Sequence, residues 1–152
     1  LFFIYRMSEL TRIERLPLDD LAQEPQFLYP DGSMRVAAWE LFGSLFFGAV
    51  NKLEELLDPG AGHPEVVVLD MGRLIQLDTT GLEGLESLRD KLAKRGCTLI
   101  VCGLNAQPGS LLLRSGFIDH LGADNVCLDR AAALARAERM LPNLMGGGEE
   151  DY

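Results

Sequence analysis

The sequence contains few of the residues from which disulfide frameworks and metal sites are built, with three cysteines and two histidines among 152 residues. Cys97, Cys102 and Cys127 lie in apolar, strand-like runs and are odd in number, which favours reduced core thiols over disulfides. The spacing of Cys97 and Cys102 does not suit a metal, and His63 and His120 have no cysteine or second histidine beside them. The sequence therefore predicts neither a disulfide framework nor a metal site.

Positive charge is also scarce. The chain has 14 Lys and Arg residues against 23 Asp and Glu, which gives a net charge of -9. Nucleic acids and anionic membrane surfaces are bound through clusters of Lys and Arg, and the sequence shows no such cluster. The phosphate-loop pattern Gly-x-x-x-x-Gly-Lys-Ser/Thr is absent as well. These observations predict no nucleic-acid partner and argue against a small nucleotide hydrolase.

Long hydrophobic runs are missing too. A membrane-spanning helix needs roughly 20 apolar residues, whereas the apolar stretch Leu1 to Tyr5 is followed at once by Arg6. On these residues alone, the stretch is interpreted as a strand or an apolar terminus. The charged segment over residues 8–25, broken by prolines, predicts a partly helical linker. The length of the chain fits one domain with a substantial core.

The most regular part of the chain is a strand followed by a helix. The Val/Leu run from Val66 to Asp70 is typical of a strand buried on both faces. A connection over 71–77 ends at Asp78, and Thr79-Thr80-Gly81 then opens a helix that extends to about Lys94, in which leucines recur at spacings of three and four. The pattern Thr80-Gly81-Leu82-Glu83 fits a capping box, with Thr80 as the cap.

The remaining elements follow from alternating apolar segments and turn residues. Asp-Gly between Gln26–Tyr29 and Met34–Phe42 predicts an antiparallel hairpin. We also expect a turn over 43–48, helices over 49–57, 107–114 and 130–140, and strands over 98–102 and 125–128. The predicted fold is a single α/β domain with a mixed sheet of four to five strands and about four helices, in which an antiparallel hairpin precedes parallel βα units.

Several polar residues follow the predicted parallel strands. Ligands and partners of such sheets meet the carboxyl ends of the strands, which places Asp70, Asp78, Thr79, Thr80 and Asn105 at one edge. Asp70 and Asp78 have two interpretations: a metal or acid/base pair, or turn and cap residues. No histidine, basic residue or nucleophile accompanies them in the sequence, so turn and cap roles are favoured. The prediction is a protein that is not an enzyme.

The same residues carry a resemblance to a known family. Asp78-Thr79-Thr80-Gly81-Leu82, the helix after it, Arg95-Gly96, and Gly103-Leu104-Asn105 together resemble the STAS domain of sulphate transporters and anti-sigma factor antagonists. Further matches are Leu113 to Phe117 and Leu45 to Asn51, and the latter resembles the SulP anion transporters in particular. The resemblance extends from about residue 25 to residue 140.

The resemblance implies a non-catalytic regulatory and protein-interaction domain on the cytoplasmic side of a SulP-type transporter of sulphate or a related anion. Residues 1–7 would be the end of a transmembrane helix, 8–25 a linker, 26–141 the STAS domain and 142–152 a flexible tail. The implied partners are the transmembrane part of the same transporter, a cytosolic protein and a second copy of the domain, with contact to the membrane only through helices upstream of residue 1.

The resemblance also points to particular residues. In anti-sigma factor antagonists a serine at this turn is phosphorylated, and Thr80 occupies its position. The alternative function is therefore a free-standing antagonist switched by phosphorylation at Thr80, although capping explains Thr80 as well. No cofactor is expected, and weak nucleotide binding is implied by the family alone. The expected partner-binding surface consists of Asp78, Thr79, Thr80, Gly81, Phe46, Phe47 and Asn105.

Overall fold

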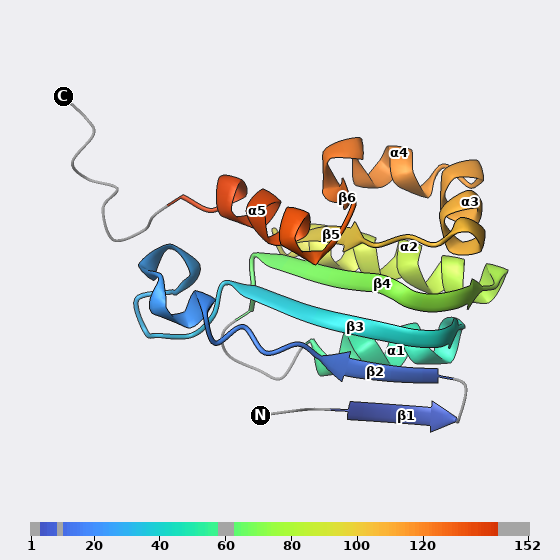
Figure 1. Cartoon of the computed structure of the whole chain (residues 1–152), viewed down its shortest axis with the longest axis horizontal. Helices are drawn as coiled ribbons and strands as arrows, with labels where there is room; N and C mark the ends of the chain where they lie inside the picture. The colour runs from blue at the N-terminus through green and yellow to red at the C-terminus, as the bar shows by residue number, and fades with distance from the viewer. Residues whose placement is uncertain (1–3, 9–10, 58–62, 143–152) are drawn as a thin grey trace.

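The computed structural model describes residues 4–8, 11–57 and 63–142. In these ranges, a six-stranded sheet has its strands in chain order, as Figure 1 shows. The strands are β1 (Ile4–Ser8), β2 (Thr11–Arg15), β3 (Val36–Leu45), β4 (Val66–Leu77), β5 (Thr98–Cys102) and β6 (Val126–Cys127). The α-helices are α1 (Phe47–Leu56), α2 (Thr79–Lys94), α3 (Ala106–Arg114), α4 (Phe117–Leu121) and α5 (Arg130–Met140).

The predicted α/β class is confirmed. Strands β1, β2 and β3 pair in antiparallel fashion, and β3 to β6 pair in parallel. The described residues have six strands rather than four to five, because two strands come from the N-terminal segment. The short helix α4 was not expected. It is separate from α3 because Gly116 takes a left-handed conformation, with φ of 86°.

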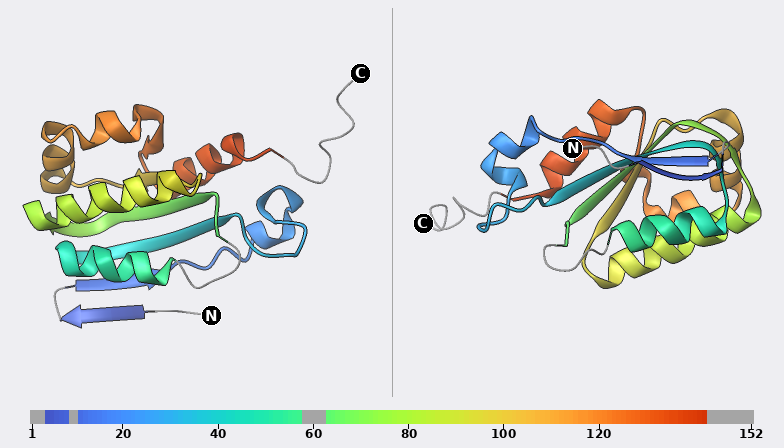
Figure 2. Two further views of the ribbon diagram at one scale, coloured as in Figure 1. Left: turned by 180° about the vertical axis from the view of Figure 1, so that it is seen from behind. Right: turned by 90° about the horizontal axis from the view of Figure 1, so that it is seen from below.

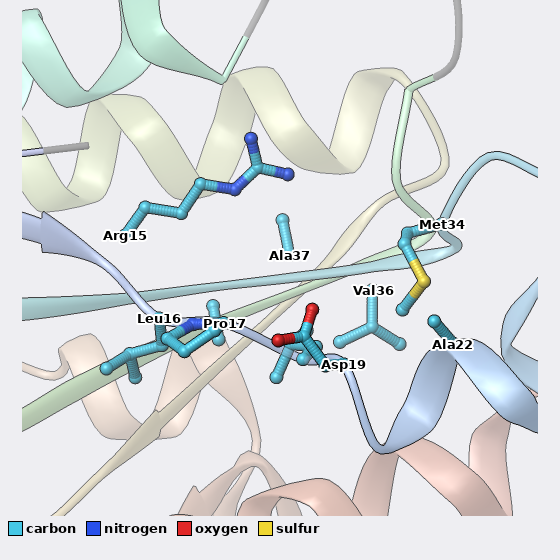
Figure 3. Close-up of a pocket in the computed structure, with 10 residues that line it drawn as sticks. Arg15, Leu16, Pro17, Asp19, Ala22, Met34, Val36 and Ala37 are labelled. Carbon is cyan, nitrogen blue, oxygen red and sulfur yellow. The ribbon is translucent and has the colours of Figure 1, made fainter. Parts of the chain in front are cut away.

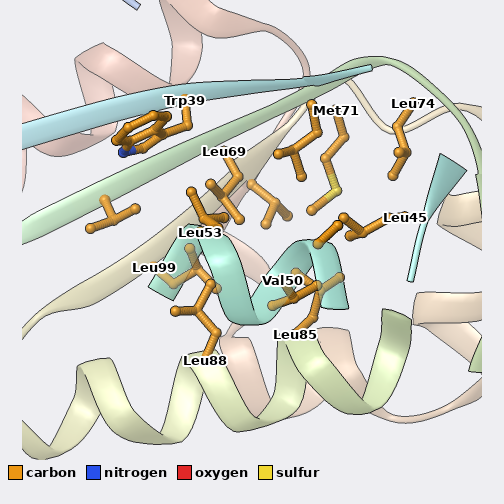
Figure 4. Packing of buried hydrophobic residues seen from close by; sticks show 14 of the residues in the cluster. Trp39, Leu45, Val50, Leu53, Leu69, Met71, Leu74, Leu85, Leu88 and Leu99 are labelled. Atoms are coloured by element: carbon orange, nitrogen blue, oxygen red, sulfur yellow. The ribbon is translucent and has the colours of Figure 1, made fainter. Parts of the chain in front are cut away.

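Helices cover the two faces of the sheet unequally. Helices α1 and α2 pack on one face and α5 packs on the other (Figure 2). The larger core lies between the sheet and the α1–α2 pair, where Leu53, Leu69 and Leu85 are fully buried (Figure 4). The two helices approach closely because α2 has a glycine at position 84, where a Cβ would be 2.8 Å from Val50 Cβ.

Strand β4 is central, as its Val/Leu run predicted, with β3 and β5 on its two sides. It is also longer than expected. The residues predicted as a connection, 71–77, continue the strand, because β3 extends as far as Leu45 and pairs with β4 up to Leu77. Residues 43–45, predicted as part of a turn, therefore belong to β3. The periodic helix after β4 is confirmed, since α2 ends at Lys94.

The N-terminal segment contributes to the sheet. In place of the partly helical linker expected over residues 8–25, Thr11–Arg15 forms β2, and only Leu21–Gln23 and Pro25–Phe27 are short helical turns. The sequence pattern did not indicate this strand because most of its residues are polar. Its apolar core residue is Ile13, which is fully buried although both of its neighbours in sequence are charged. In place of the end of a transmembrane helix over residues 1–7, Ile4–Ser8 forms the edge strand β1.

The hairpin predicted over residues 26–42 is reduced to one antiparallel bridge, between Leu28 and Met34. The turn between its arms does form, with Tyr29 and Ser33 hydrogen-bonded through their backbones. However, the first arm begins in the helical turn at Pro25, and the antiparallel partner of β3 is β2. The sequence thus indicated an antiparallel pair ahead of the parallel part but assigned it to the wrong segment.

Two further expectations concern the ends of the chain and the membrane. Residues 1–3 and 143–152, which include most of the expected tail, lie outside the described residues. Among the helices that the structure does describe, none has the length and apolar character needed to cross a membrane.

Arg35 joins the N-terminal segment to the end of α5. Its side chain is 1% exposed, and Nη1 donates to the backbone oxygens of Gln26 and Pro142, each at 2.7 Å. Nη2 forms an ion pair with Glu65 at 2.9 Å. Because these partners come from three segments distant in sequence, Arg35 fixes the position of α5 on the sheet.

Candidate functional site

The predicted turn lies where two helices begin. The hydroxyl of Thr80 donates to Asp78 Oδ1 at 2.7 Å and accepts a hydrogen bond from the backbone N–H of Phe47 at 3.2 Å. Phe47 is the first residue of α1, and Thr80 lies in the first turn of α2. One hydroxyl therefore links the N-terminal ends of both helices, and it remains exposed at the surface.

The cap of α2 is Asp78, which corrects the prediction that Thr80 is the cap. Asp78 Oδ1 accepts from the backbone N–H of Gly81 at 2.7 Å, as an N-cap carboxylate does. The hydrogen bond from the Thr80 hydroxyl, followed by that from the Gly81 N–H, lowers the pKa of Asp78 below its usual 3.8. The Thr80 hydroxyl is thus a second hydrogen-bond donor to the Asp78 carboxylate and supports the cap.

Gly81 is required by packing. A Cβ at this position would be 2.9 Å from the carbonyl carbon of Leu45 and 2.8 Å from Leu77 Cδ1. Real Cβ atoms essentially never approach backbone atoms this closely. Gly81 therefore lets α2 start directly against the ends of β3 and β4, and it is buried rather than part of a surface.

Exposed side chains lie at this turn and on the chain that leads to it: Phe47 contacts Thr80 through its backbone N–H, and Ile75 lies near the end of β4, shortly before Asp78. We define the tip surface as Phe47, Ile75, Asp78, Thr79 and Thr80. The Phe47 side chain is 48% exposed and that of Ile75 is 70% exposed. Asp78, Thr79 and Thr80 are exposed as predicted, whereas Phe46 is half-buried and packs against the core. Sequence reasoning missed Ile75 because it was assigned to a connecting loop.

Asn105, which was predicted to be part of the partner-binding surface, is exposed and also holds the edge of β4. Strand β5 ends beside Asp70, so the last part of β4 has no strand on that side. Asn105 Nδ2 donates to the backbone oxygens of Gly72 and Leu74, at 3.0 and 2.9 Å. The amide of Gln107 both accepts from the N–H of Leu77, at 2.8 Å, and donates to its oxygen, at 2.9 Å. These two side chains provide hydrogen-bond partners for backbone groups along the unpaired edge of β4. They therefore hold in place the end of the strand that leads to the tip surface.

Asp70 does not join the tip surface. It is 8% exposed and forms an ion pair with Arg130 of α5, with Oδ2 at 2.9 Å from Nη2. No local pattern indicated a basic partner for Asp70, because Arg130 is 60 residues away. Asp70 and Asp78 therefore belong to separate sites, which removes the interpretation of a paired acid and base.

A cavity lies elsewhere on the molecule (Figure 3). It has a volume of about 270 Å³ and is lined by residues of β2, β3 and the segment after β2, including Arg15, Asp19, Met34 and Val36. The lining is mostly aliphatic, and neither a histidine nor a cysteine belongs to it. The cavity is also separate from the tip surface, which shares none of its lining residues.

The chemistry of the tip surface is suited to binding. Asp78 is hydrogen-bonded to the Thr80 hydroxyl, but a carboxylate with a lowered pKa is a weak general base. In the described ranges, no three His, Cys, Asp or Glu side chains lie together in a way that could hold a metal ion. The exposed Phe47 ring beside a hydrogen-bonded polar turn, with Ile75 exposed on the strand that leads to it, instead resembles the apolar and polar elements of a protein interface.

Replacing Asp78 with alanine should lower the free energy of unfolding at pH 7 by about 1 kcal/mol, because α2 loses its N-cap. Since the pKa of Asp78 is lowered in the folded state, its contribution exists above the ordinary value of 3.8 and is lost as the pH falls through the folded-state pKa. Thermal unfolding of both proteins between pH 7 and pH 2 should show their difference in stability shrinking in acid. A constant difference across this range would contradict the assignment.

Comparisons with known proteins agree with this geometry. The STAS domain family model matches residues 32–133. The Bacillus subtilis (strain 168) protein named "Putative sulfate transporter YvdB" is 30% identical over 125 residues, which are 80% of this chain and 22% of that protein. The chain thus spans less than a quarter of the length of that relative.

Solved structures show the same similarity. A sulfate transporter family protein from Wolinella succinogenes superposes with a TM-score of 0.63 at 30% identity, covering 74% of this chain and 93% of that chain. The STAS domain of a SulP transporter from Vibrio cholerae has a TM-score of 0.60 at 23% identity, covering 70% of this chain and 83% of that chain. The second likeness shows the fold alone. With a family model that matches most of its length, this chain belongs to the STAS domain family.

Proposed function

We propose that this chain is a non-catalytic docking domain of a SulP-type anion transporter, on the cytoplasmic side of the membrane, and that it binds its partner through the tip surface. The observation that carries the proposal is the exposure of Phe47 beside a turn that is held by the hydrogen bonds of Asp78 and Thr80, with Ile75 exposed near the end of the strand that leads to the turn. The similarity to a sulfate transporter family protein supports a transporter as the parent protein.

The rigidity of the turn favours recognition. The hydrogen bonds of Thr80 hold the starts of α1 and α2 together, and Asn105 and Gln107 hold the end of β4. A surface that is already ordered loses little conformational entropy on binding, so more of its contact energy contributes to affinity. The exposed aromatic ring of Phe47 is the type of side chain that contributes most at the centre of an interface.

The partner that we propose is the transmembrane part of the same transporter. The chain spans 22% of the length of its sulfate-transporter relative, so most of such a protein would lie outside this domain. In this arrangement the domain regulates transport of sulphate or a related anion without binding the anion itself. The net charge of -9 is consistent with a domain that does not bind the transported anion, since a negative protein does not favour an anionic ligand.

The test uses the full product of the gene that encodes this chain. We expect Thr80→Glu, and separately Phe47→Ser, to reduce cross-linking between the domain and the membrane part about tenfold, equivalent to about 1.4 kcal/mol. Transport of radiolabelled sulphate should change in the same variants. Leu113→Ser is the matched control, because Leu113 is 64% exposed on α3 and lies outside the tip surface.

Binding and transport that are unchanged in the Thr80 and Phe47 variants, with the fold intact by circular dichroism, would contradict the assignment of the tip surface. If the full gene product has no membrane-spanning segments, the proposal that the parent protein is a transporter is contradicted.

A second candidate function is a free-standing anti-sigma factor antagonist switched at Thr80. One observation favours it: the exposed hydroxyl lies at the N-terminal ends of two helices, where a phosphate is stabilised. The Asp78 carboxylate, 2.7 Å from this hydroxyl, would repel a phosphate and makes the candidate weaker. Mass spectrometry of the protein from its own cells should detect phosphothreonine at position 80 if this function is correct.

A further inference from the structure

A cluster of charged residues lies on the face of the sheet that α5 covers in part. Glu40 of β3 and Asp70 of β4 are paired in register on neighbouring strands, and they are 9% and 8% exposed. Both carboxylates contact Arg130, the first residue of α5. Arg130 Nη2 lies 2.9 Å from Asp70 Oδ2 and 3.4 Å from Glu40 Oε2. One guanidinium therefore joins the start of α5 to two buried carboxylates.

The two carboxylates are not equally stabilised. Asp70 accepts hydrogen bonds from Arg130 Nε at 3.0 Å and from the backbone N–H of Gly72 at 2.9 Å. Glu40 has longer contacts, at 3.4 Å to Arg130 and 3.8 Å to Arg73, whose side chain is 70% exposed. Burial, followed by the negative charge of Asp70, raises the pKa of Glu40. Glu40 should therefore take up a proton at a higher pH than an ordinary glutamate.

The other charged groups around Glu40 come from each element that packs against it. Strand β4 contributes Asp70 and Arg73, α5 contributes Arg130, and β2 contributes Glu14, which is opposite Glu40 in register. Arg12 of β2 lies 4.0 Å from Glu14 and packs over the Phe42 ring. The two arginines that contact Glu40 offset its burial and the two neighbouring acids only in part.

We propose that Glu40, Asp70 and Arg130 form a proton-responsive clamp on α5, in which a proton from solvent binds the Glu40 carboxylate and leaves Arg130 to pair with Asp70 alone. The repulsion between two buried carboxylates is then removed, and the start of α5 packs more tightly on β3 and β4. The clamp is independent of the tip surface, with which it shares no residue.

The expected dependence on pH follows from linkage. A carboxyl whose pKa is raised in the folded state stabilises that state fully below its unfolded-state pKa, and this stability is lost as the pH rises through its folded-state pKa. Above that pKa, the ionised Glu40 costs stability. This dependence is opposite to that of Asp78, so the two sites can be distinguished by the direction of their effects.

The test measures thermal unfolding and the protection of α5 amides, as exchange relative to the intrinsic rate at each pH, between pH 7.5 and pH 4 on the 152-residue chain. At pH 7.5 we expect Glu40→Gln to unfold at a temperature a few degrees above the wild type and to slow exchange near residue 132 several-fold. Both differences should shrink as the pH falls through the folded-state pKa of Glu40, which lies above the ordinary value of 4.5. Glu138→Gln is the matched control, since it removes an exposed negative charge from the same helix outside the cluster.

A second variant keeps the proposal falsifiable if Glu40→Gln folds poorly. In Arg130→Gln, the protection of α5 amides relative to their intrinsic exchange rates should be lower at every pH and should lose its wild-type rise in acid. The proposal is overturned if the protection of α5 in the wild type, relative to the intrinsic exchange rate at each pH, does not rise as the pH falls, or if Glu40→Gln is less stable than the wild type at pH 7.5 and keeps its pH dependence.

Discussion

Replacing Arg35 with methionine is expected to lower the free energy of unfolding by about 3 kcal/mol, the largest effect of the substitutions considered. Methionine fills much of the same volume but donates no hydrogen bond. The backbone oxygens of Gln26 and Pro142 would lose a charged donor, and Glu65 would lose its ion-pair partner. A buried acceptor that loses its donor costs more than the hydrogen bond contributed on average.

Denaturant unfolding measures this change, and the melting temperature should fall by on the order of 10 °C. Arg139→Met is the control, because it removes an exposed arginine from α5 and should have little effect. Arg35→Lys should be intermediate, since a single ammonium cannot reach three acceptors in the geometry of a guanidinium. A loss below about 1 kcal/mol for Arg35→Met would contradict the role of Arg35 in holding α5.

Gly81→Ala is expected to lower the free energy of unfolding by about 2 kcal/mol, the cost of forcing an added methyl into a packed site. In an unconstrained helix the same change would be stabilising, because alanine is the better helix former. At position 81, however, the new methyl would collide with the carbonyl group of Leu45, which is backbone and cannot rotate away. The start of α2 must shift, which should also weaken binding through the tip surface.

Gly109→Ala provides the matched comparison. This glycine also lies inside a helix, but its Cβ would be 3.5 Å from Leu104 Cβ, an ordinary contact. We expect this variant to be as stable as the wild type or slightly more stable. Chemical denaturation of the two variants side by side distinguishes packing from helix propensity. Equal stability of the two would show that α2 can move without cost and would contradict the packing argument.

Local patterns were reliable wherever contacts within a segment decide its structure. The leucine spacing of α2 predicted both the helix and its end at Lys94. The Val/Leu run at Val66 predicted a central strand, because a strand buried on both faces leaves no polar alternation. The turn at residues 78–80 was correctly placed at the surface, although its cap was assigned to the wrong residue.

Errors arose where distant residues decide the structure. Strand β2 was interpreted as a linker, because its charged side chains are stabilised only beside β3, where Arg12 packs over Phe42. The extension of β4 was interpreted as a loop, because its free edge is completed by Asn105 and Gln107. Neither the pairing of β2 with β3 nor the side-chain contacts at the edge of β4 produces a periodic pattern of apolar residues in the segment concerned.

The amino-acid sequence alone determined the family, the α/β class, the central β4–α2 unit and the exposed turn that ends in Gly81, because each follows from neighbouring residues or short motifs. Only the tertiary structure decided which strand pairs with β3, that Asp78 rather than Thr80 caps α2, and that Asp70 pairs with Arg130. The physical reason is that strand pairing and buried ion pairs depend on which side chains the folded chain brings within a few ångströms, whatever their separation in sequence.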